Sequence, residues 1–76
     1  MSYNEIFAGA VVKEGYTMLA LVSDGFMFHA ILRRNKAKDF VYCYEYDIKD
    51  GSWVQGHYCD SYADAANELA HHIGMM

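Results

Sequence analysis

The chain has 76 residues, of which 54% are apolar and twelve are aromatic, and its net charge is −4. This composition excludes a membrane-spanning chain, because no apolar run approaches the roughly 20 residues of a span. It also excludes a disulfide scaffold, because there are only two cysteines, Cys43 and Cys59. We expect one ordered domain over residues 1–76, located in the cytoplasm because the first residues lack the basic start of a signal peptide.

The first predicted element is a helix over residues 3–14. Ser2 and Glu5 match a capping box, in which the serine hydroxyl accepts from the amide of Glu5. Apolar residues then recur at helical spacing, and Gly15 suits the left-handed position that ends a helix. A glycine and two adjacent valines inside this range weaken the helix, so a strand stays open as the alternative.

Residues 16–33 carry the clearest pattern, two apolar runs on either side of Asp24-Gly25. An Asp-Gly pair suits a two-residue type I′ turn, which would pair Ser23 with Phe26. One face of this hairpin is then a core face made by Leu19, Leu21, Phe26, Phe28, Ala30 and Leu32. The other face is also mostly apolar, and we expect the N-terminal helix or a second copy of the chain to cover it. The residues proposed for such a dimer face are Met18, Val22, Met27 and Ile31.

A second hairpin is predicted over residues 39–59, around Asp50-Gly51. Two registers compete. A two-residue turn pairs Ile48 with Trp53, whereas a three-residue loop closed by a glycine bulge pairs Ile48 with Ser52. The second register separates apolar from polar residues more cleanly and is preferred. A one-residue slip exchanges the two faces, so this choice decides which side chains meet.

Ser61 predicts the cap of a final helix over residues 62–73, with Asp64 near the positive end of the helix dipole. The predicted order is helix, four strands, helix (αββββα). Short connections make a four-stranded antiparallel meander the expected sheet. The sequence therefore predicts an α+β fold, with two Asp-Gly hairpins forming the sheet and a helix at each end of the chain.

In the preferred register Cys43 lies opposite His57, with Cys59 on the same face. A thiol beside a histidine can be reactive, and two sulfurs with one nitrogen suit zinc. The spacing lacks the paired ligands of structural zinc sites, and no motif accompanies a nucleophile. We therefore expect no catalytic residue, metal or cofactor, and a thiol or zinc site at these three residues is only the third hypothesis for function.

Four of the six Lys and Arg residues fall within residues 33–38, between the two hairpins. They are Arg33, Arg34, Lys36 and Lys38. A basic loop can contact phosphates, and an aromatic-rich sheet can stack bases, which makes a nucleic-acid-binding module the second hypothesis. It is not favoured, because the rest of the chain carries a charge of −8, the total of −4 less the +4 of this loop.

The acidic and aromatic residues of the second half support the first hypothesis, a non-catalytic module that binds a protein partner. Tyr and Trp are favoured at protein interfaces, and a fixed acidic array can imitate phosphates. By analogy of size and charge with small acidic proteins of phages and mobile elements, its sharpest form is an inhibitor that blocks a nucleic-acid-binding host protein, as an anti-CRISPR or DNA mimic does. The predicted partner-binding residues are Glu45, Asp47, Asp50, Trp53, Tyr58, Asp60, Asp64 and Glu68.

Overall fold

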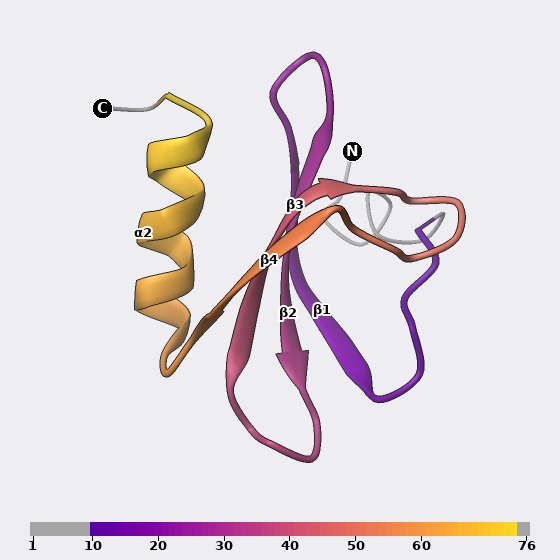
Figure 1. Cartoon of the computed structure of the whole chain (residues 1–76), viewed down its shortest axis with the longest axis vertical. Coiled ribbons are helices and arrows are strands. Elements are labelled where there is room, and N and C mark those ends of the chain that lie inside the picture. The colour runs from indigo at the N-terminus through magenta and orange to yellow at the C-terminus, as the bar shows by residue number, and fades with distance from the viewer. Residues whose placement is uncertain (1–9, 75–76) are drawn as a thin grey trace.

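The computed structural model describes residues 10–74, and residues 3–9 of the predicted N-terminal helix lie outside the described residues. A four-stranded antiparallel sheet carries one helix on one of its faces (Figure 1). The elements are β1 (Tyr16–Ser23), β2 (Phe28–Arg34), β3 (Phe40–Tyr46), β4 (Gln55–Cys59) and α2 (Tyr62–His72). The spatial strand order β1-β2-β3-β4 confirms the predicted meander.

Residues 10–14, the described part of the predicted N-terminal helix, and Gly15 after them form neither a helix nor a strand. They run beside the turn between β3 and β4 (Figure 1). There the amide of Val11 donates to the carbonyl of Ile48 at 2.8 Å, and the Tyr46 hydroxyl donates to the carbonyl of Val11 at 2.6 Å. The prediction that helix continues to residue 14 is therefore wrong, because these backbone groups are satisfied by the turn and by a tyrosine instead of by a helical neighbour.

β1 and β2 form the first hairpin, but their connection is longer than predicted. Ser23 pairs with Phe28, so four residues, 24–27, join the strands in place of a two-residue Asp-Gly turn. One oxygen of the Asp24 carboxylate accepts from two amides later in the loop, at 2.8 and 2.9 Å, and this side chain holds the wider turn. Phe26, predicted for the core face, is 94% exposed as a consequence.

A β-bulge in β1 exchanges two side chains between the faces of the sheet. The pairing with β2 shifts between Met18 and Ala20, so that Leu19 is the extra residue. Leu19 packs with Ile31 on the side of α2, whereas Met18 packs on the opposite side. The prediction had these two side chains the other way round.

β3 and β4 pair in neither of the two predicted registers. Tyr42 pairs with His57 and Cys43 with Gly56, one residue away from the preferred register. Residues 47–54 connect the two strands, and within them an isolated bridge between Asp47 and Ser52 encloses a four-residue turn, 48–51. The amide of Gly51 donates back to the carbonyl of Asp47, which closes this longer turn.

The sheet has an apolar core on each of its faces. On the face away from α2 the buried side chains include Leu32, Val41 and Cys43, with Trp53 packed against them. On the other face Ile31 and Tyr42 of the sheet and Ala65 of α2 are fully buried where the helix packs on the sheet. The C-terminal helix thus covers the part of the second apolar face that lies on β2.

The C-terminal helix forms where it is predicted. The Ser61 hydroxyl accepts from the amide of Asp64 at 3.1 Å, which satisfies one of the free donors of the first turn. None of the helices in residues 10–74 has the length and apolar character that crossing a membrane requires.

Candidate functional site

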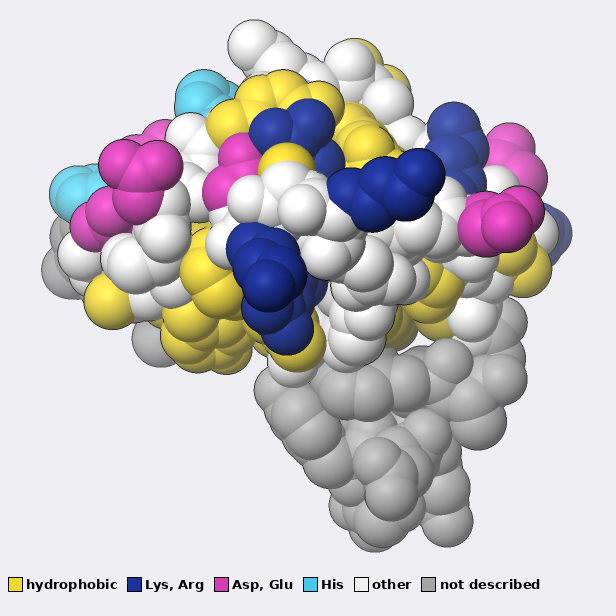
Figure 2. Space-filling view, turned by 90° about the horizontal axis from the view of Figure 1, so that it is seen from below, with side chains coloured by type: hydrophobic (Ala, Val, Ile, Leu, Met, Phe, Trp, Pro, Cys, Tyr) yellow, Lys and Arg dark blue, Asp and Glu magenta, His cyan; other side chains and the backbone are white. Residues whose placement is uncertain are grey.

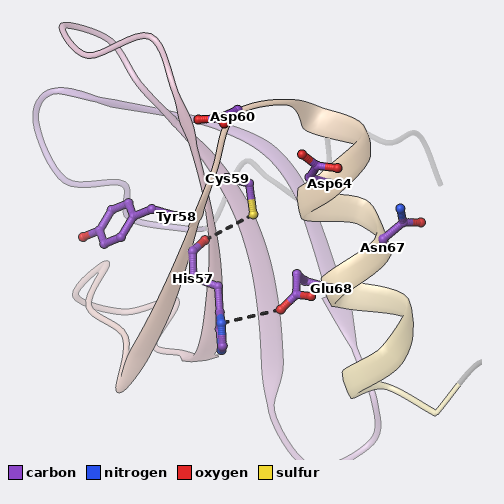
Figure 3. Close-up of a pocket in the computed structure, with 7 residues that line it drawn as sticks. All are labelled: His57, Tyr58, Cys59, Asp60, Asp64, Asn67 and Glu68. Atoms are coloured by element: carbon purple, nitrogen blue, oxygen red, sulfur yellow. Dashed lines mark hydrogen bonds and ion pairs between the residues drawn. The ribbon is translucent and has the colours of Figure 1, made fainter.

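An open groove of about 500 Å³ lies between β4 and α2 (Figure 3). The strand and the turn after it contribute four consecutive residues, 57–60, so the groove runs along β4. His57 and Cys59 point from the strand toward the helix, and Tyr58 points away from it. The helix side is lined by Asp64, Asn67 and Glu68.

The groove is acidic. Three carboxylates, those of Asp60, Asp64 and Glu68, line it, and none of its lining residues is Lys or Arg. Burial raises the pKa of the Cys59 thiol, and the negative charges of these three residues raise it further. The groove is therefore a place where added negative charge is disfavoured and positive charge is favoured.

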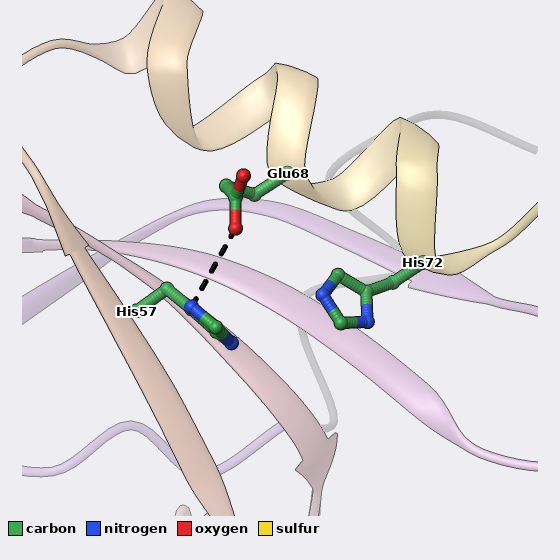
Figure 4. Close-up of side chains that lie close together, drawn as sticks. All are labelled: His57, Glu68 and His72. Atoms are coloured by element: carbon green, nitrogen blue, oxygen red, sulfur yellow. Dashed lines mark ion pairs between the residues drawn. The ribbon is translucent and has the colours of Figure 1, made fainter.

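A histidine and a carboxylate bridge the groove, and a second histidine stands beside them (Figure 4). His57 Nδ1 and Glu68 Oε1 lie 3.5 Å apart, and both side chains are about 40% exposed. His72 comes from the next turn of α2, and the nearest donor atoms of all three residues lie within 4.8 Å of one another. The site thus combines one residue of β4 with two residues of α2.

Tyr42 forms an aromatic floor beneath this group. Its ring lies 5.9 Å from the ring of His57 and 5.2 Å from that of His72, centroid to centroid. The ring of Tyr44 lies 5.3 Å from that of His72, edge to face. These contacts hold the two imidazoles in defined orientations.

A buried chain of hydrogen bonds holds the Tyr42 ring in place. His29 is 1% exposed, and its Nε2 lies 2.8 Å from an Asp24 carboxylate oxygen. Because a carboxylate only accepts, Nε2 carries the proton, and in the neutral ring Nδ1 accepts from the Tyr42 hydroxyl at 2.7 Å. The hydrogen bond from His29, together with two backbone amides, lowers the pKa of Asp24 to about 2.

The thiol or zinc site predicted at Cys43, His57 and Cys59 does not form. Cys43 pairs with Gly56, and its side chain is buried in the core on the face away from α2. Burial raises the pKa of Cys43 to about 12, which suppresses its thiolate. The one-residue error in the predicted register is the physical reason, since it put Cys43 and His57 on one face.

The predicted partner-binding residues fall into separate groups. Tyr58, Asp60, Asp64 and Glu68 line the groove, whereas Glu45 and Asp47 line a second hollow of about 450 Å³ beside the first hairpin loop. Asp50 caps its own turn by accepting from the amide of Ser52 at 2.9 Å. Trp53 is half-buried between Tyr16 and Tyr46, so it belongs to the core.

The basic loop between β2 and β3 is partly used within the fold. Arg34 forms two hydrogen bonds of 2.6 Å to the Asp39 carboxylate, and its guanidinium lies 4.7 Å from the centre of the Tyr58 ring. Arg33, Lys36 and Lys38 are exposed. Figure 2, seen from below, shows Lys and Arg side chains near the middle of this end of the molecule and acidic side chains at its flanks. Nucleic-acid binding by this loop stays a prediction.

The residues predicted to form a dimer face do not form one surface. Ile31 is fully buried under α2, and Met18 lies on the other side of the sheet. Val22 and Met27 are half-buried. Self-association itself stays a prediction, but Ile31 and Met18 cannot contribute to one common patch.

Comparison of the chain with models of protein families, with curated proteins and with solved structures found no match. What the groove does is therefore inferred from its own residues.

Sequence reasoning identified three carboxylates of the groove but missed His72. The signal that could have found it is the spacing of Glu68 and His72, four residues apart and hence on one face of the helix. Their partner His57 was predicted to lie opposite Cys43 instead, because the preferred register of the second hairpin differs by one residue from the one that forms.

Proposed function

We propose that this protein is an interaction module that binds an extended, basic segment of a partner protein in the groove between β4 and α2. The observation that carries the proposal is that an acidic groove follows the outermost strand of the sheet. Among residues 10–74, β4 pairs only with β3, so its other edge has no strand partner. An edge strand with a helix beside it suits the addition of a peptide as a further strand.

The chemistry of the groove defines the occupant. An added strand gains its affinity from main-chain hydrogen bonds, and alternate side chains give specificity because they point to the same face. Every second side chain of a bound peptide would face α2, where Asp60, Asp64 and Glu68 lie. Lys or Arg at these alternate positions would pair with the carboxylates, and the negative field would speed association at low salt.

The class of partner follows from this charge. Surfaces that bind nucleic acid are rich in Lys and Arg, because they neutralise phosphates. A protein that occupies such a segment would compete with the nucleic acid for it. Inhibition of a nucleic-acid-binding protein, as expected from the sequence, is therefore the form of the proposal that we favour.

The proposal is tested with a labelled synthetic peptide of alternating Arg and Val, against one of alternating Glu and Val. We expect the basic peptide alone to bind, more weakly at higher salt. In the amide NMR spectrum the largest shifts should fall on residues 55–60 and 64–68. A chelator is present throughout, so that binding does not depend on metal.

Two matched double variants distinguish the effect of the groove carboxylates on peptide binding from the effect of the protein's net charge. Asp60→Asn combined with Asp64→Asn should weaken binding roughly three- to tenfold, the range for two exposed charge pairs. Glu14→Gln combined with Glu45→Gln removes the same charge from exposed residues outside the groove and should change binding little. Equal losses in both double variants, or equal binding of the acidic peptide, would contradict the proposal.

A further inference from the structure

Three side chains of types that bind metals, those of His57, Glu68 and His72, lie close together where β4 faces α2. His57 Nδ1 and Glu68 Oε1 lie 3.5 Å apart, and the donor atoms of His57, Glu68 and His72 all lie within 4.8 Å (Figure 4). Glu68 and His72 are one helical turn apart, so both project from the same face of α2. A site built from a strand and a helix turn is thus already assembled by the fold.

The donor set has a definite chemistry. Two imidazole nitrogens and one carboxylate oxygen suit zinc, and three protein ligands leave a fourth position open for water or another ligand. Tetrahedral zinc with bonds near 2.0–2.1 Å places its ligand atoms roughly 3.4 Å apart. The separation of His57 Nδ1 and Glu68 Oε1, 3.5 Å, is close to this value, and the donor atom of His72 lies within 4.8 Å of the other two.

The packing and the charge around these three side chains favour the binding of a metal ion. The rings of both histidines pack against Tyr42, which is fully buried and held by His29. His57 is half-buried and His72 is exposed, and contact with Tyr42 restricts the orientation of both rings before any ion arrives, which lowers the entropy lost on binding. His57 and Glu68 are each about 40% exposed, so an ion can reach them from solvent. Asp60 and Asp64 line the same groove and add a negative field that attracts a cation.

We propose that His57, Glu68 and His72 bind one divalent transition-metal ion, with zinc as the best match. The ion would bridge β4 and α2 and hold the helix on the sheet. This inference does not rest on the proposed peptide binding, because the metal site needs no partner protein. Its ligands also differ from Asp60 and Asp64, the residues substituted in the peptide-binding test.

The experiment is a calorimetric titration of Zn²⁺ into the tag-free, chelator-treated full chain. We expect one ion per chain and a melting temperature that rises by roughly 10–20 °C at a hundredfold excess of zinc over its Kd. Visible absorption of Co²⁺ in the same site should report tetrahedral coordination. His57→Ala, Glu68→Gln and His72→Ala should each weaken binding by more than about tenfold, since even loss of an outer-shell partner costs 10- to 100-fold.

The neighbouring His71 provides the matched control. It is exposed on α2 but does not belong to the cluster, so His71→Ala should leave the affinity within about twofold of the unaltered chain. His72→Phe keeps an aromatic ring against Tyr42 and removes only the donor, and it should lose zinc while the fold persists. Absence of binding, equal losses in the His71 and His72 variants, or unchanged affinity in His72→Phe would overturn the proposal.

Discussion

At the scale of single residues, the buried His29 links two distant parts of the fold through its two ring nitrogens. His29 connects the first hairpin loop, through Asp24, to the hydroxyl of Tyr42 under α2. Tyr42 in turn packs against the rings of His57 and His72. The proposed metal site therefore rests on a hydrogen-bond chain that the ion itself would not touch.

Removing the Tyr42 hydroxyl tests this chain. Tyr42→Phe keeps the ring but leaves the buried Nδ1 of His29 without its partner, which should lower the free energy of unfolding by about 1–3 kcal/mol. Tyr44→Phe is the matched control, because Tyr44 is only half-buried and its hydroxyl makes no hydrogen bond within residues 10–74. Urea denaturation of both variants measures the difference. Equal effects of the two substitutions would argue against a structural role for the chain.

The Asp24 carboxylate gives this chain a dependence on pH. Its pKa is lowered to about 2 in the fold, below the value of about 3.9 in an unfolded chain. A carboxyl group whose pKa is lower in the folded state stabilises the fold above the unfolded pKa, and this contribution is lost as the pH falls through the folded pKa. We therefore expect stability to fall between about pH 4 and pH 2. Asp24→Asn should be less stable at neutral pH and should lose less of its stability across that window, as followed by urea midpoints at each pH.

At the scale of elements, the sequence predicted the number and order of the strands and the final helix, but not the connections between strands. Asp24-Gly25 and Asp50-Gly51 both lie in four-residue turns, 24–27 and 48–51, the second of them within the longer connection 47–54. Side chains within the loops determine how many residues each turn contains. The Asp24 and Asp47 carboxylates accept from amides two or three residues ahead, an interaction that a strand pattern does not reveal.

The two glycines of these loops offer a direct test of the N-terminal segment. Both have positive φ, +95° at Gly25 and +74° at Gly51, so alanine strains either backbone. A Cβ at Gly25 would meet no atom within 4 Å, but one at Gly51 would lie 2.8 Å from the carbonyl oxygen of Val11. We expect Gly25→Ala to cost about 1 kcal/mol and Gly51→Ala at least twice as much. Chemical denaturation measures both, and similar costs would mean that residues 10–13 do not pack against this turn.

At the scale of the whole molecule, the sequence did not predict which elements pack on the two faces of the sheet. The apolar pattern of the first hairpin correctly indicated two faces in need of cover, and the acidic residues of the groove could be named in advance. The packing of α2 decides which face of the sheet is covered by a helix. The register of the second hairpin decides whether His57 lies near Cys43 or near Glu68, and a shift of one residue exchanges the two. Local sequence spacing carries no information on such contacts between distant elements, except for Glu68 and His72 on one helix.

The role of α2 as the cover leads to a prediction about assembly. Ala65 is fully buried where α2 meets the sheet, so Ala65→Glu would place a charge in an apolar core without a partner. Such burial costs several kcal/mol, a large part of the roughly 5–15 kcal/mol that stabilises a typical domain. We expect α2 to leave the sheet, expose Ile31 and Tyr42, and cause the chain to self-associate. Circular dichroism should report the loss of helix, and light scattering should report the increase in mass.

The control for this prediction lies two residues earlier. Ala63 is exposed on the same helix, so Ala63→Glu adds the same side chain and charge without burying either. This variant should keep its helix and the association state of the unaltered chain. If Ala65→Glu behaved in the same way, α2 would not be the cover of this face, and the groove and the metal site that depend on its position would lose their structural basis.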